Sequence, residues 1–314
     1  MKSRSIHIIL KQRSETMDKT ILEQLKAYFL EMDQKRKQNR LQSNLKYAIE
    51  NLDVETAKEL IESGASVELI EKEESTLGMA AHTYTSRLFQ IVDQYRKQKH
   101  IKSDVYLEQI NNLGKKELEP ELNAQMEEAT RNLLTMSELL YQHGANINHN
   151  TYLGLKDSGT LMDIFSEKKE IMKVPTVFAK MAEGVIWLSK DMSVLEWIAS
   201  KPDFDITKLE DSNIISSFLH AGCPESAQAL QLVLEKGLQI KSTDVYGIEY
   251  NALIECLAHQ ELNNRQEKFH LLWQHAKQEQ RDYVMENFDL SSIEISTNFG
   301  ENTQDSSGYG TMGK

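Results

Sequence analysis

Apolar residues recur along most of the chain with the spacing of amphipathic α-helices. The first such run follows Asp18, and its members fall on one stripe of a helix. They are Ile21, Leu22, Leu25, Tyr28, Phe29 and Met32. The next segment, 33–40, is rich in Lys, Arg and Gln, which is typical of a solvated surface. We therefore predict a flexible extension over 1–17 and a capping helix over 18–42 that packs through its apolar stripe.

A pattern of paired helices repeats after this capping helix. Leu45 and Ala48 open one helix, a polar turn follows at 51–53, and a second helix ends at Gly64. Glycine at the end of a helix supplies the left-handed conformation that terminates it. Comparable openings occur at Leu77 with Ala80, at Leu161 and at Leu253, and comparable ends occur at Gly144 and Gly237. We expect these residues to be the structural positions of a repeated unit.

At these residues the chain resembles the ankyrin-repeat family. The openings at Leu45 and Leu77 are 32 residues apart, near the 33-residue ankyrin period of a β-turn and two short antiparallel helices. The Thr-Pro-Leu-His opening of the family is not intact, because the equivalent tetrads read Ser-Asn-Leu-Lys, Ser-Thr-Leu-Gly and Gly-Thr-Leu-Met. A helical-hairpin solenoid of the tetratricopeptide kind is the alternative, and the glycine-ended second helices favour ankyrin.

An insertion interrupts the second unit. Gly64 follows Leu45 by 19 residues, whereas Gly144 follows Leu77 by 67, so about 48 residues are added. Helical spacing on both sides of a polar loop predicts that residues 82–131 form a helical hairpin.

The whole chain is thus expected to be all-α, an ankyrin-like helical-repeat solenoid with an inserted helical hairpin and terminal capping helices. About five irregular repeats occupy 43–276, and a C-terminal capping helix occupies 277–290. The tail at 291–314 is rich in Ser, Thr, Asn and Gly and is expected to be disordered.

The charge of the chain limits the classes of molecule that it can bind. Its 314 residues carry a net charge of −12, and residues 1–40 hold ten basic against five acidic side chains, which leaves −17 for the rest. Such a surface repels phosphate backbones, so no nucleic-acid partner is expected. Apolar runs are too short to span a membrane. The two cysteines, Cys223 and Cys256, predict reduced structural thiols in a cytosolic protein.

The residue types of catalysis do not assemble into a recognisable motif. His220 lies three residues before Cys223, a spacing more typical of a helix end than of a catalytic dyad. The histidines lack metal-ligand spacing, and no phosphate loop or nucleotide fingerprint occurs. We expect no catalytic residue, metal or cofactor. The alternative is an enzyme with an unrecognised active site in the insertion or near Cys223.

The ankyrin resemblance implies that the concave face, built from turn tips and first helices, recognises a protein. The predicted tips carry carboxylates and aromatic side chains suited to such contacts. The candidate binding residues are Glu68, Glu71, Glu73 and Glu74 in the first tip, His149 and Tyr152 in the second, and Asp244, Tyr246 and Tyr250 in the last. We also considered Trp187, which is less clearly a core residue than Trp197 and Trp273.

The irregular repeats, the insertion and the C-terminal tail resemble the ankyrin effectors that intracellular bacteria such as Legionella and Coxiella send into host cells by type IV secretion. That resemblance implies a tail used for translocation and a place of action in the host cytoplasm. We expect a non-enzymatic, monomeric protein that binds and modulates a host protein or another bacterial effector.

Overall fold

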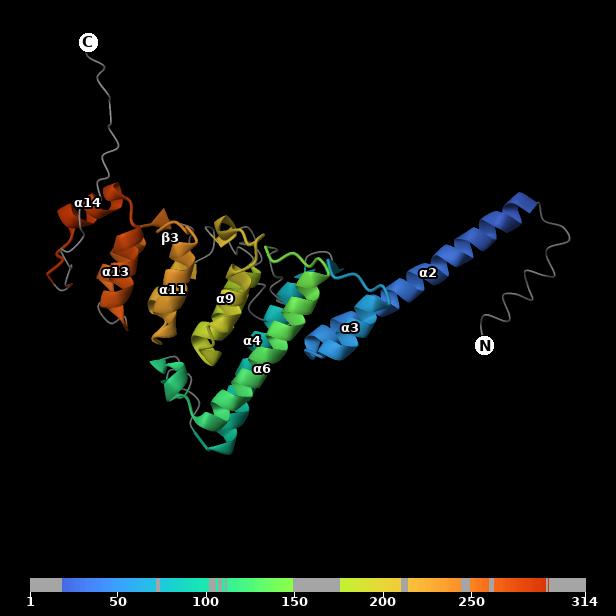
Figure 1. Ribbon diagram of the computed structural model, residues 1–314, viewed down its shortest axis with the longest axis horizontal. Coiled ribbons are helices and arrows are strands. Elements are labelled where there is room, and N and C mark those ends of the chain that lie inside the picture. The colour runs from blue at the N-terminus through green and yellow to red at the C-terminus, as the bar shows by residue number, and fades with distance from the viewer. Residues whose placement is uncertain are drawn as a thin grey trace, which may run out of the picture.

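The computed structural model describes residues 19–71, 74–101, 106, 109–110, 112–148, 176–209, 214–243, 249–259, 263–291 and 293. This part of the chain is predominantly helical (Figure 1). Its α-helices are α2 (Lys19–Glu50), α3 (Val54–Glu62), α4 (Thr76–Gln98), α6 (Pro120–Gln142), α8 (Val177–Gly184), α9 (Ser193–Ala199), α10 (Ile214–His220), α11 (Glu225–Glu235), α12 (Ala252–Ala258), α13 (Arg265–His275) and α14 (Gln278–Asn287). A π-helical turn, η3 (Val185–Ser189), extends α8, and short 3₁₀ turns lie at η1 (Lys115–Glu117) and η4 (Ile206–Leu209).

The helices form two rows. In one row α3 packs on α6, α6 on α9, α9 on α11 and α11 on α13. In the other row α2 packs on α4, α4 on α8, and α10 on α12. Figure 1 shows α6, α9, α11 and α13 side by side, with α4 behind α6. We call the row of α6, α9, α11 and α13 the outer row and the row of α4, α8, α10 and α12 the inner row.

Three helices, α3, α6 and α11, end in the same way. Gly64, Gly144 and Gly237 follow α3, α6 and α11 with φ angles of +96°, +95° and +94°. In each case the amide of the next residue donates to a carbonyl five positions earlier, at 3.0 Å, as from Ala65 to Leu60. This 6→1 bond satisfies a helix-end carbonyl, and it requires the left-handed glycine before it.

Short antiparallel hairpins follow two of these ends. Strand β1 (Leu69–Glu71) pairs with β2 (Glu74–Ser75), and β3 (Ser242–Thr243) pairs with β4 (Glu249–Tyr250). Ser75 then caps α4, since its hydroxyl accepts a hydrogen bond of 2.9 Å from the amide of Gly78. The sequence that ends one helix pair therefore also positions the start of the next.

The residues that we predicted to form an inserted helical hairpin lie mostly on α4 and α6, which are both 23 residues long and pack on each other. The inserted sequence lengthens these two helices. Lys115, in the connection between them, is fixed to the rest of the molecule. Its amide donates to Glu225 Oε1 at 2.8 Å, and its ammonium lies 2.8 Å from Asp191 Oδ2.

The core runs between the two rows. The predicted repeat leucines and alanines inside the described ranges, namely Leu45, Ala48, Leu77, Ala80 and Leu253, are at most 1% exposed. Leu161, the second predicted tip and the predicted tail from 294 onward lie outside the described residues, as do residues 1–18.

The N-terminal helix differs from our expectation. It runs without a break through the predicted boundary at 42, so the predicted capping helix and the first repeat helix are one element. Its apolar stripe is not packed on the described part of the protein, because Ile21 and Tyr28 are 48% and 55% exposed. The N-terminal half of α2 projects beyond the two rows (Figure 1), so no described helix covers the stripe, and its packing stays a prediction.

Candidate protein-binding face

Most of the predicted tip residues lie outside the part of the chain whose side chains the structure describes. Glu73, His149, Tyr152, Asp244 and Tyr246 lie outside the described residues. Glu71, Glu74 and Tyr250 belong to strands whose backbone pairing is described but whose side chains are not. Glu68 alone among these candidates has a described side chain, and it is exposed before β1. The described candidate surface therefore comes from the first helices.

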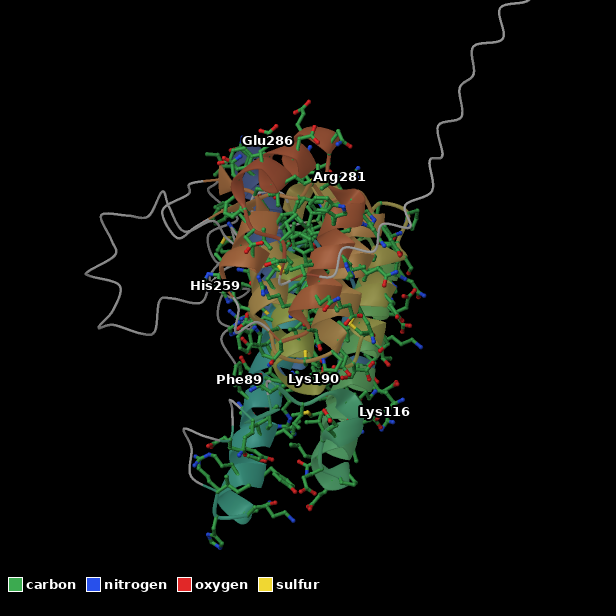
Figure 2. All side chains as sticks on the ribbon, turned by 90° about the vertical axis from the view of Figure 1, so that its left-hand side faces the viewer. Phe89, Lys116, Lys190, His259, Arg281 and Glu286 are labelled. Atoms are coloured by element: carbon green, nitrogen blue, oxygen red, sulfur yellow. The ribbon has the colours of Figure 1, made fainter. Side chains whose placement is uncertain are left out.

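Each helix of the inner row buries most of its surface and exposes one stripe. We call the surface made by these stripes the inner face. Its members are His82, Ser86 and Phe89 on α4, Lys180, Glu183 and Trp187 on α8 and η3, Ser216 and His220 on α10, and His259 after α12. Figure 2 shows Phe89 and His259 on one side of the molecule and Lys116 on the opposite side.

Close packing of α4 on α8 sets the geometry of the first half of this face. Thr85 Oγ1 donates to the carbonyl of Lys180 at 3.2 Å. A Cβ at Gly184 would lie 3.0 Å from the Tyr84 ring, so the helices approach at a position that only glycine fits without displacement. This register places His82 beside Lys180 and Glu183, which form an ion pair of 2.7 Å. Burial, and then the charge of Lys180, lower the pKa of His82.

Two aromatic side chains lie further along the chain on the same pair of elements, Phe89 on α4 and Trp187 on η3 after α8. Phe89 is 42% exposed and Trp187 is 37% exposed. By contrast, Trp273 is 6% exposed, and Trp197 is half-buried with its indole N–H donating to Glu138 Oε2 at 2.7 Å. Exposed Trp and Phe at the centre of a surface are typical anchors of protein interfaces. Trp187, whose place in the core the sequence left open, is therefore a surface residue.

The second half of the inner face is polar. His220 Nε2 lies 3.0 Å from Glu255 Oε1, and the hydroxyl of Ser216 donates to the same oxygen at 2.6 Å. The rings of His220 and His259 meet edge to face, with centroids 5.0 Å apart. Glu255 Oε2 is buried without a hydrogen-bond partner among the described residues. Ser216 therefore bonds to the carboxylate and not to the imidazole, which is unlike a nucleophile–base pair.

A polar groove adjoins the inner face where α4 and α6 extend beyond the turn between α2 and α3. His82 and Ser86 contribute to its wall together with side-chain amides from both helices. These amides belong to Gln90 and Gln94 on α4 and to Gln125 and Asn132 on α6. Glu50, Arg87 and Glu128 also line the groove, so its wall is polar and carries charges of both signs.

Cys223 and His220 are not brought together as a catalytic pair. Cys223 is fully buried, and its thiol donates to the carbonyl of Ile186 at 3.3 Å. Cys256 is also buried, and burial raises its pKa to about 12. A thiol that holds its proton so strongly is a poor nucleophile.

Two lysines are buried beside these thiols. Lys190 Nζ donates to the carbonyl of Ile186, and Lys268 Nζ donates to the carbonyls of Leu219 and Ala221 at 3.0 and 2.6 Å. Burial lowers the pKa of both ammonium groups, that of Lys268 to about 8. These bonds to carbonyls at helix ends indicate capping of α10 and η3. Figure 2 shows Lys190 within the body, away from the inner-face residue Phe89.

Within the described ranges, no group of three or more His, Cys, Asp or Glu residues is arranged to hold a metal ion. None of the described helices is both long enough and apolar enough to cross a bilayer.

The sequence pointed to the tips, and it missed Phe89 and the exposed stripes of α8 and α10. A helical spacing of Lys180, Glu183 and Trp187 would have indicated a solvent-facing stripe within an otherwise apolar segment. No protein-family model matches the chain, and no curated protein matches its sequence.

Proposed function

We propose that the chain is a non-enzymatic, ankyrin-like repeat scaffold that binds a protein partner through its inner face. The single observation that carries the proposal is the pair of exposed aromatic side chains, Phe89 and Trp187, on neighbouring helices of that face. Exposing both rings to water is unfavourable, and a partner that covers them recovers this free energy.

The proposal that the helix pairs are repeats is supported by three equivalent helix ends. The glycines after α3, α6 and α11 share one φ value within 2° and one hydrogen-bond pattern. Hairpins follow the first and last of these glycines, and a new inner helix follows each hairpin. This order of helix, helix, glycine and hairpin is the order of the ankyrin unit.

The proposed scaffold acts by binding a partner, and the side chains of its inner face are of the types found in protein interfaces. The ion pair of Lys180 with Glu183 and the histidines of the inner face would supply the polar part of an interface whose apolar anchors are the two aromatic rings. We retain the effector hypothesis on the resemblance stated above, with a host protein or another bacterial effector as the partner.

Affinity capture tests the proposal. The full chain and a Phe89→Ala/Trp187→Ala variant are immobilised and exposed separately to eukaryotic and bacterial lysates, and captured proteins are identified by mass spectrometry. We expect a partner that the wild type captures and the variant loses. Tyr283→Ala removes an aromatic side chain that is 53% exposed on α14, and this control should capture the partner as the wild type does.

Equal capture by all three proteins would contradict binding through the inner face. The melting temperature of each protein is measured in parallel, so that a loss of capture is attributed to the surface only when the variant remains folded. The lysate that yields the partner also distinguishes a host target from a bacterial one.

A further inference from the structure

The apolar stripe on the N-terminal half of α2 is a second surface, which the proposed scaffold does not use. Ile21, Tyr28 and Phe29 are 48%, 55% and 38% exposed, and the Tyr28 and Phe29 rings meet edge to face at 5.9 Å. Leu25 and Met32 lie on the same stripe and are half-buried. Figure 1 shows this half of α2 projecting away from the two rows of helices.

The rest of the described protein is on the wrong side of α2 to cover this stripe. The C-terminal half of the helix packs on the core through Leu45, Ala48 and Ile49, which are at most 1% exposed. Because an α-helix turns by about 100° per residue, Leu25 and Leu45 point about 160° apart. A bend of α2 toward the described core would therefore not bury the stripe.

A helix that stands alone in water gains little from its own backbone hydrogen bonds. Isolated helices of this kind are marginal, and most helical stability in proteins comes from packing of an apolar face. The stripe of α2 has the spacing of that face, since Ile21, Leu25, Tyr28 and Met32 alternate steps of four and three as in a coiled coil.

We propose that two copies of the chain associate through this stripe, with the N-terminal halves of their α2 helices packed antiparallel. Pairing centred between Leu25 and Tyr28 brings Ile21 of one copy opposite Met32 of the other, and Leu25 opposite Tyr28. Each of these four side chains then meets another apolar side chain. This proposal replaces the expectation of a monomer.

The charges along α2 select the antiparallel direction. The spacing of the stripe continues from Met32 to Lys35, so in a parallel pair the two Lys35 ammonium groups would face each other. Like charges at such positions repel. In the antiparallel pair the basic run at 35–40 lies beyond Ile21 of the other copy, so equivalent cations are far apart.

The area available predicts a weak, concentration-dependent dimer. A buried aromatic side chain covers about 150–250 Å², and roughly half of this is still exposed at Tyr28 and Phe29, so the four rings of two copies offer about 300–500 Å². Ile21, Leu25 and Met32 add to this area. The total stays near or below the roughly 1,000 Å² that a stable interface buries, so the predicted dimer is weak and depends on concentration.

Sedimentation equilibrium of the full chain over a range of micromolar concentrations tests the dimer. We expect the mean mass of the wild type to rise from monomer to dimer and that of Tyr28→Glu to remain monomeric. Leu30→Glu is the matched control, because Leu30 is 62% exposed but lies about 160° around the helix from Tyr28. It should dimerise as the wild type does.

Oxidative cross-linking tests the direction. We expect a mixture of Ile21→Cys and Met32→Cys proteins to form a disulfide-linked heterodimer, and neither protein alone to cross-link efficiently. The native cysteines do not interfere, since both are fully buried. Efficient cross-linking of Ile21→Cys with itself would overturn the antiparallel arrangement.

A wild type that stays monomeric at every concentration would overturn the proposal. So would a monomer that sediments with vesicles of phosphatidylserine and phosphatidylcholine, since the stripe would then serve a membrane surface. The melting temperature shows whether Tyr28→Glu is folded. The test does not involve Phe89 or Trp187, so its failure is separate from a failure of the proposed partner binding.

Discussion

At the scale of single residues, buried lysines donate hydrogen bonds to helix-end carbonyls. At most helix ends, water or a capping side chain makes these bonds. Lys268 is fully buried, and its ammonium bonds to the carbonyls of Leu219 and Ala221. The Ala221 carbonyl also accepts a hydrogen bond of 3.2 Å from the Ser226 hydroxyl, so Lys268 shares this helix end with a second buried donor. Burial of the charge opposes these bonds, and this conflict makes the stability of the protein depend on pH.

Lys268 should stabilise the fold more at alkaline pH than at neutral pH. Its pKa is lowered by burial from 10.5 to about 8 in the folded protein. Between these values the unfolded chain binds one more proton than the folded chain, so the free energy of unfolding rises with pH. We expect this contribution to be on the order of 2 kcal/mol between about pH 7 and about pH 10.

Urea unfolding of the wild type and of Lys268→Met at both pH values isolates the effect. Other groups titrate equally in the two proteins, and the loss of the hydrogen bonds in the variant is common to both pH values. The difference in unfolding free energy between the proteins should therefore change with pH. A difference that is the same at both pH values would contradict the shifted pKa.

Gly64 is a second residue whose role follows from its conformation. Its φ of +96° is strained for side chains with a Cβ, and a Cβ there would meet no atom within 4 Å. Gly64→Ala should therefore cost about 1 kcal/mol through the backbone alone. Gly64→Asn should cost less, because asparagine tolerates the left-handed region. A melting temperature of the alanine variant equal to that of the wild type would refute this role.

At the scale of elements, buried hydroxyl groups connect helices that would otherwise meet only through apolar contacts. Tyr84 on α4 is fully buried, and its hydroxyl donates to Ser189 on η3 at 2.7 Å and lies 3.1 Å from Thr130 on α6. Burial raises its pKa to about 12, so the hydroxyl keeps its proton and remains a donor. One side chain thus ties the lengthened α4–α6 pair to the π-helical turn.

Tyr84→Phe should weaken this junction without creating a cavity. The variant leaves the hydroxyls of Ser189 and Thr130 buried with fewer partners, which should lower the free energy of unfolding by about 1–3 kcal/mol. Denaturant unfolding measures the loss. Tyr47→Phe makes the same chemical change at a side chain that is 68% exposed, and its stability should match the wild type.

Local sequence signals predicted the regular elements well and their relations less well. The Asp53 side chain caps α3, and the glycines end α3, α6 and α11, because caps and left-handed turns depend on a few adjacent residues. The extent of α2 was not predicted, since no local signal separates a capping helix from the repeat helix that continues it. Its stripe gave the correct helical period but no information on what lies beside it.

At the scale of the whole molecule, the candidate binding face depends on how the inner helices align. Phe89 and Trp187 are nearly 100 positions apart in the sequence, and they lie on α4 and η3, which pack against each other. Sequence reasoning pointed to the tips, whose polar character is local. It could not find a surface that arises from the register between two helices.

The most direct test of the account is a calorimetric titration of the captured partner with the wild type, Trp187→Ala and Tyr283→Ala. If the inner face is the binding surface and Trp187 is one of its anchors, Trp187→Ala should weaken the affinity at least about tenfold, since truncating a central aromatic residue commonly costs about 2 kcal/mol or more. Tyr283→Ala should bind as the wild type does. An unchanged Kd for a folded Trp187→Ala protein would contradict the central claim.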